Sequence, residues 1–273
     1  MNTSLLKMSF KKEYWEYNRV LFLLPMVMVI VMVIMPFITF LANDTSHIPW
    51  LESFKSFSTL AESPDLPKAF FALTMGVFVP FFAIATLIQL YYFLACLYDE
   101  KKDLSVYFWR SLPVSDLKTL SVKLVTGTLV IPCIFMLAAT VTLFICLAIG
   151  FIATIILSVG FDISFWGAWA NAGIIKTLVM AWANVIPTSL WLLPLFTWFM
   201  LSSMFATKAP FLWATLPVVL LLILESIFLP HSYIGNIIGN YFLIPQQVVT
   251  QYANGLEHLN TISVKVLMEK VSV

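Results

Sequence analysis

Charged residues are scarce in this chain, and their scarcity decides the class of protein. They make up 11% of its 273 residues, whereas 61% of the residues are hydrophobic. Soluble domains carry about 25% charged residues, so a soluble globular fold is excluded. The net charge is only +1, and no basic stripe runs along the sequence. We therefore expect the lipid bilayer as the surroundings of the chain and no nucleic-acid partner.

Catalytic and metal-binding motifs are also missing. The chain has no G-x-x-x-x-G-K-[ST] phosphate loop, so we expect no ATPase activity of its own. The apolar runs lack the paired acids, Ser–Lys or Ser–His dyads and histidine clusters that an intramembrane enzyme would need. The histidines are isolated, which predicts no metal site. The three cysteines fall in or beside apolar runs and are interpreted as small buried hydrophobic residues without a disulfide, namely Cys96, Cys133 and Cys146.

Long apolar runs fill most of the chain. About 20 apolar residues in a helix cross a hydrocarbon core of roughly 30 Å. Residues 20–42 are apolar on every face apart from Thr39, which indicates a helix and not an alternating strand. The sequence thus predicts an all-α fold, a polytopic transmembrane helical bundle of five to six spans in one domain covering 1–273. The spans are expected near 20–42, 69–97, 124–150, 177–205 and 211–229.

Three regions of the chain have ambiguous helix boundaries. The uncharged run 124–161 is interpreted as one long helix, because a hairpin at Gly150 would reverse the sidedness of everything after it. Pro187 and Pro194 should kink the fourth span. The stretch 231–245 is apolar but contains two glycines and a proline, so we expect a broken, re-entrant or interfacial element on the outer side.

Basic residues set the expected orientation. Cytoplasmic flanks of membrane helices carry an excess of lysine and arginine, which places the N-terminus and the segment 98–123 inside. The apolar run after Arg19 is too long for a cleaved signal peptide, so the lead-in 1–19 is expected to stay as an amphipathic segment. Its Tyr14 and Trp15 suit the membrane interface.

The segment 98–115, YDEKKDLSVYFWRSLPVS, carries a family resemblance. An acidic-basic cluster after the second span, followed by an Arg-Ser-Leu-Pro-Val-Ser turn, resembles the first cytoplasmic loop of ATP-binding-cassette (ABC) exporter permeases of the ABC-2 type. The turn 206–210, ATKAP, followed by FLWA, is similar to the second inner loop of that family. By this resemblance the inner loop 98–123 is an amphipathic coupling loop, with these candidate coupling residues: Asp99, Glu100, Lys101, Val106, Trp109, Arg110, Leu112, Pro113, Ser115 and Lys118.

The resemblance implies a permease subunit of an ABC exporter in the bacterial cytoplasmic (inner) membrane. A separate ABC ATPase subunit, carrying ATP and magnesium, would dock on the inner loop, and a second permease copy or a paralogue would complete a dimer. Members of that family usually have six spans with both termini inside. The chain is therefore truncated before a sixth span after residue 273, or the region 235–245 crosses after all, or this is a five-span variant. The alternative is a non-transporting membrane assembly or immunity factor.

Glu225 is an acid within an apolar run. A carboxylate in hydrocarbon is costly, so it is a candidate for the substrate path. Glu225 also lies five residues before Pro230, near the expected outer interface, where a structural hydrogen bond or snorkelling explains it equally well. No set of charges in the spans selects a substrate.

Overall fold

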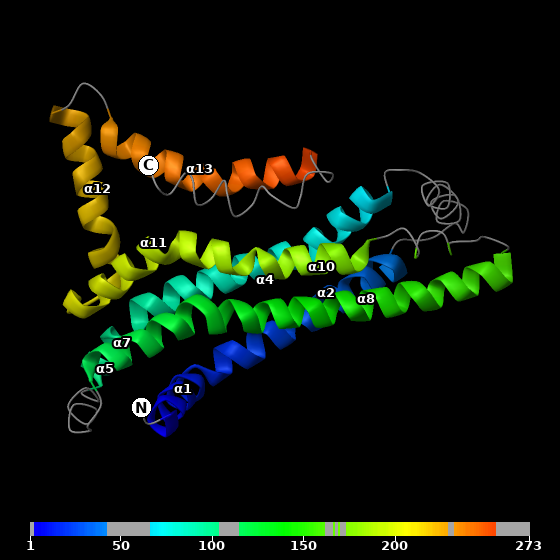
Figure 1. Ribbon diagram of the computed structural model, residues 1–273, viewed down its shortest axis with the longest axis horizontal. Helices are drawn as coiled ribbons and strands as arrows, with labels where there is room; N and C mark the ends of the chain where they lie inside the picture. The colour runs from blue at the N-terminus through cyan, green and yellow to red at the C-terminus, as the bar shows by residue number, and fades with distance from the viewer. Residues whose placement is uncertain are drawn as a thin grey trace. The chain divides into compact units, whose positions relative to one another are not determined.

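The fold is helical throughout the part of the chain that can be described. The computed structural model describes residues 3–42, 66–103, 115–161, 166, 169, 173–228 and 232–254. Within these ranges the regular elements are helices and none is a strand (Figure 1), which confirms the all-α prediction. The elements are α1 (Thr3–Glu16), η1 (Arg19–Leu23, π-helical), α2 (Leu24–Ala42), α4 (Leu66–Ala95), α5 (Tyr98–Lys102), α7 (Asp116–Val125), η2 (Thr126–Val130, π-helical), α8 (Ile131–Phe161), α10 (Ile174–Ala183), α11 (Val185–Phe205), α12 (Pro210–Phe228) and α13 (Tyr233–Asn254).

Five helical stretches among the described residues are long and apolar enough to cross a membrane. They are Arg19–Ile38, Phe70–Lys102, Asp116–Gly160, Ile174–Phe205 and Pro210–Phe228. Many of their large apolar side chains are exposed, as on α2, where Met26, Ile30 and Ile34 are each about half exposed. Lipid tails can cover such side chains and water cannot do so without a cost in free energy. The chain is therefore a multi-pass membrane protein.

The third stretch is a single continuous run. Helix α7 passes through η2 into α8, which includes Gly150 and ends at Phe161 (green in Figure 1). No hairpin forms at Gly150, as expected. A lone glycine costs a helix about 1 kcal/mol, which is less than the cost of leaving backbone groups without partners in hydrocarbon.

The fourth stretch is interrupted at Asn184, between α10 and α11. Pro187 is the third residue of α11, where the first backbone N–H groups have no partner within the helix. The proline ring also disfavours a helix that continues on its N-terminal side. Pro194 lies inside α11. The break at Asn184 therefore lies three residues before Pro187.

The region 231–245 does not break as the sequence suggested. Helix α13 runs without interruption from Tyr233 to Asn254 and includes Gly235, Gly239 and Pro245. Packing explains part of this difference. The Tyr241 ring stacks on Trp191 of α11, with ring centroids 5.3 Å apart, and its hydroxyl donates a hydrogen bond to the Trp191 carbonyl oxygen. Partial burial there raises the pKa of the Tyr241 phenol.

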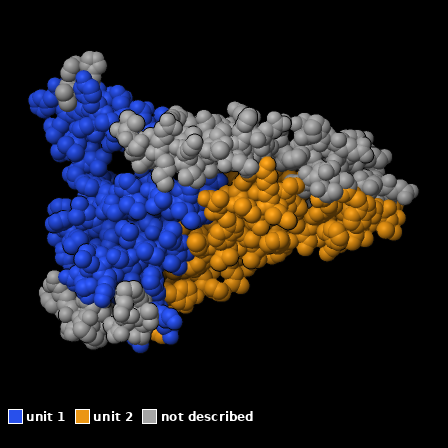
Figure 2. Space-filling view, viewed as in Figure 1, with its two compact units in different colours: residues 1–13, 86–131, 184–273 blue, residues 14–85, 132–183 orange. Residues whose placement is uncertain are grey.

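The chain divides into two compact units, which Figure 2 colours separately. One unit combines residues 1–13, 86–131 and 184–273, and the other combines 14–85 and 132–183. Both are assembled from segments far apart in the sequence, and helices α1, α4 and α8 each contribute residues to both units. The first unit contains most of the candidate functional residues that were predicted from the sequence.

Candidate functional site

The described part of the inner loop consists of its two ends. Helix α5 supplies Asp99, Glu100 and Lys101 at the first end of the loop, and Ser115 and Lys118 lie at the start of α7, near its other end. The other candidate coupling residues lie outside the described residues, namely Val106, Trp109, Arg110, Leu112 and Pro113.

Ser115 starts the helix after the loop. It occupies the N-cap position of α7 with an extended backbone (φ −73°, ψ 143°) and makes no side-chain capping bond. Its carbonyl oxygen accepts hydrogen bonds from the N–H groups of Lys118 (2.9 Å) and Thr119 (3.3 Å). Lys118 is exposed, and Leu117 beside it is 77% exposed. The entry into α7 therefore offers a charged and an apolar side chain to the surroundings.

Helix α5 is attached to the second predicted inner loop. The backbone N–H of Tyr98 donates to Ser203 Oγ (2.9 Å), and Lys101 Nζ donates to the carbonyl oxygen of Ala206 (3.3 Å). Asp99, on the same short helix, is half-buried. Two segments that the sequence assigned to the same side of the membrane thus contact each other within one unit.

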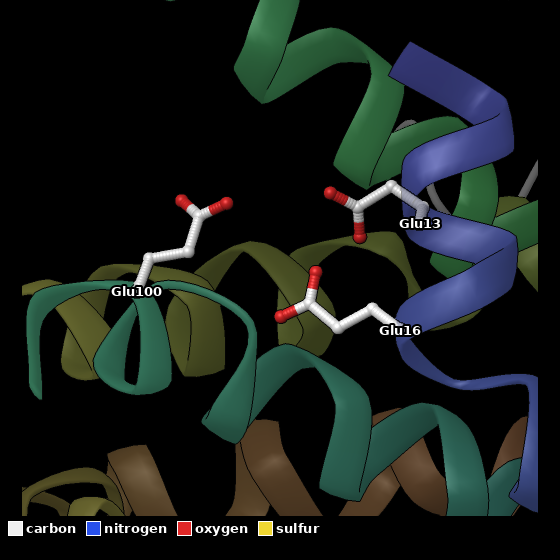
Figure 3. A group of neighbouring side chains, drawn as sticks. All are labelled: Glu13, Glu16 and Glu100. Carbon is white, nitrogen blue, oxygen red and sulfur yellow. The ribbon is translucent and has the colours of Figure 1, made fainter. Parts of the chain in front are cut away.

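Glu100 is buried, whereas a residue that contacts a docked subunit must be exposed. Its side chain is buried in an ion-pair cluster that we define as Lys12, Glu13, Glu100 and Lys123. Lys123 Nζ lies 2.8 Å from Glu13 Oε1 and 3.2 Å from Glu100 Oε1, and Lys12 pairs with Glu100. Figure 3 shows Glu13 on α1 and Glu100 on α5, with Glu16 one helical turn beyond Glu13.

Lys123 is the centre of this cluster and is completely buried. Besides the two carboxylates, its ammonium donates to the carbonyl oxygen of Cys96 (3.2 Å). The second oxygen of Glu13 accepts a hydrogen bond from the Tyr92 hydroxyl (2.8 Å). Buried charges of this kind are tolerated only when they are paired and hydrogen-bonded, as Lys123 is with Glu13 and Glu100 here.

Carboxylate oxygens of Glu13, Glu16 and Glu100 lie within 4.8 Å of one another. Acids this close could hold a cation, and the ammonium of Lys123 pairs with Glu13 and Glu100 there. The cluster is therefore suited to holding α1, α5 and α7 together and not to binding a metal in place of the lysine.

Sequence reasoning missed this cluster. It used Lys123 only to assign sidedness and did not single out Glu13. One weak signal was present: Lys123 directly precedes the uncharged run 124–161, and Glu13 is an acid among the lysines of the lead-in. Neither position indicates a pair across 110 residues.

A second set of contacts adjoins the cluster at η2. Gln89 Nε2 donates to the carbonyl oxygen of Gly127 (2.8 Å), one of the carbonyls of the π-helical turn. The Phe93 ring lies directly against Gly127 and stacks on Phe196 with a centroid separation of 4.7 Å. A π-helical turn changes the backbone hydrogen-bond register, and the Gln89 amide satisfies a carbonyl there.

Glu225 has a structural partner. It is buried on α12, and its carboxylate accepts hydrogen bonds from the backbone N–H groups of Ile234 and Gly235, the latter at 3.0 Å. These N–H groups belong to the first turn of α13, where helices leave donors without internal partners. Of the two sequence-based interpretations, this geometry favours the structural hydrogen bond over the substrate path.

Comparison with known proteins assigns no family. No protein-family model, curated protein or solved structure matches the chain. A function must therefore be argued from the membrane helices, the ion-pair cluster and the inner loop that starts and ends beside it.

Proposed function

We propose that this chain is the membrane-spanning permease subunit of an ATP-binding-cassette exporter of the ABC-2 type. A separate ATPase subunit, which holds ATP and magnesium, docks on the inner loop 98–123. The observation that supports this most directly is that one buried cluster joins both ends of that loop, since Glu100 and Lys123 meet at the same site.

A motor outside the membrane needs a rigid connection to the helices that it moves. The residues that close the inner loop are held on α1 by Glu13 and Lys12. Glu13, Glu100 and Lys123 are buried, so salt screens their pairing less than it screens exposed ion pairs. Lys101 further ties α5 to Ala206. A force on the loop would thus reach α1, the second and third spans and the end of α11 together.

The exposed side chains beside the loop support docking. Lys101, Lys102, Asp103 and Lys118 are exposed and surround the ends of the loop, together with Leu117. Charged side chains around an apolar contact are typical of interfaces between protein subunits. A second permease, as a copy or a paralogue, would close the transport path in a dimer. The bacterial inner membrane is part of the same proposal.

The test is co-purification in detergent with the ATPase encoded beside this chain. We expect the wild type to retain the ATPase, and the Leu117→Ala/Lys118→Glu and Val106→Ala/Trp109→Ala variants to lose it. Lys176→Glu on α10 is the matched control, because Lys176 is exposed but belongs to the predicted outer side; it should bind like the wild type.

Two outcomes would count against the proposal. A wild-type chain that binds no ATPase would favour the non-transporting assembly or immunity factor. Equal loss in Lys176→Glu and in the loop variants would mean that the loop is not the docking element.

A further inference from the structure

Helix α1 presents two opposite faces. Glu13 is buried at 2% exposure and belongs to the ion-pair cluster. At 3.6 residues per turn, five exposed residues lie within about 60° of Lys11, whereas Glu13 lies about 160° away from it. This exposed set, which we call the lipid face, consists of Lys7, Met8, Lys11, Tyr14 and Trp15.

The lipid face does not separate polar from apolar side chains, as an ordinary amphipathic helix does. Its two lysines stand one turn apart, and large side chains flank them: Met8 is 69% exposed and Trp15 is 65% exposed. The acid at the end of the helix, Glu16, lies about 140° around from Lys11, so the lipid face carries no carboxylate. A basic row with aromatic and thioether neighbours is the chemistry of a membrane interface, where lysines meet phosphates and rings enter the acyl boundary.

The chain itself places α1 at the bilayer. Helix α1 ends at Glu16, and the first candidate span begins at Arg19. Three residues reach at most about 10 Å, so the end of α1 stays within about 10 Å of the point where this span enters its leaflet. Tyr14 and Trp15 are the residues nearest that end. The occupant best supported by position and by charge is therefore lipid.

We propose that the lipid face of α1 binds the headgroups of anionic phospholipids. Each lysine near a negatively charged membrane surface strengthens association by about fivefold. Because Glu13 projects from the other side of the same helix, lipid binding and the ion-pair cluster hold α1 from opposite faces. This inference does not depend on the ATPase.

The test uses the full-length protein in phosphatidylcholine bilayers that contain a spin-labelled lipid. Electron paramagnetic resonance measures the motionally restricted fraction of labelled phosphatidylglycerol and, separately, of labelled phosphatidylcholine. We expect the wild type to prefer phosphatidylglycerol, and the preference to weaken as salt is added. Lys7→Gln/Lys11→Gln should lower it by about fivefold or more.

Lys102→Gln/Lys118→Gln is the matched control, since it removes the same charge from exposed positions outside α1. It should retain most of the preference. Thermal unfolding of each variant checks that the fold is intact. Equal binding of both lipids by the wild type, a preference that salt leaves unchanged, or an equal loss in the control would each overturn the proposal. The lipid face would then serve another occupant, such as an acidic partner protein. No ATPase is present in this assay, so its outcome is separate from that of the proposed function.

Discussion

Replacing Lys123 by methionine removes the central cation of the ion-pair cluster while keeping a side chain of similar length. Glu13 would keep the Tyr92 hydroxyl, and Glu100 would keep Lys12. The two carboxylates, within 4.8 Å of each other, would lose the ammonium between them. The carbonyl oxygen of Cys96 would lose a donor as well.

The expected loss in the free energy of unfolding follows from the burial of this pair. Removing one partner of a buried ion pair costs about 3–5 kcal/mol, because the other charge stays buried without compensation. Glu13→Gln/Lys123→Met removes one charge of each sign, so it should cost less than the sum of the two single changes, by about 1 kcal/mol or more. Lys118→Met, at an exposed position of the same helix, should change the free energy by about 0.5 kcal/mol at most.

Equilibrium unfolding in mixed dodecylmaltoside and dodecyl sulfate micelles, followed by circular dichroism, measures the wild type and the four variants. A cost below about 1 kcal/mol for Lys123→Met would show that the cluster does not hold a tightly paired buried charge. Strict additivity of Glu13→Gln and Lys123→Met would show that the two residues do not interact.

Two further changes test the neighbouring contacts. A Cβ atom on Gly127 would lie 2.2 Å from Phe93 Cζ, and the buried ring is stacked on another ring, so Gly127→Ala should cost about 1–3 kcal/mol. Adding Phe93→Leu to the Gly127→Ala variant should restore part of the melting temperature that Gly127→Ala loses. If nothing is restored, the steric overlap between residue 127 and the Phe93 ring is contradicted. Glu225→Ala should cost about 1 kcal/mol and speed amide hydrogen exchange at Ile234 and Gly235, with Glu225→Gln between alanine and wild type. Unchanged exchange in Glu225→Ala would contradict the capping role.

The helices were readable from local sequence because a membrane acts on each span separately. Every span must be apolar over its own length and must satisfy its backbone internally, so hydropathy alone predicts it. The absence of charge over 124–161 likewise predicted a continuous helix through Gly150. Local reasoning failed for α13, where glycines and a proline suggested a break. A stacking and hydrogen-bonding contact between Tyr241 and Trp191, from distant positions, supports the helix there.

Composition and hydropathy alone determined that this protein is an all-α, multi-pass membrane protein. Only the tertiary structure decided that Lys123, Glu13 and Glu100 meet, and that Glu225 caps the start of α13. The physical reason is that hydropathy depends on a residue and its neighbours in the chain. An ion pair between Glu13 and Lys123 depends instead on which helices pack together, and no spacing in the sequence records that choice.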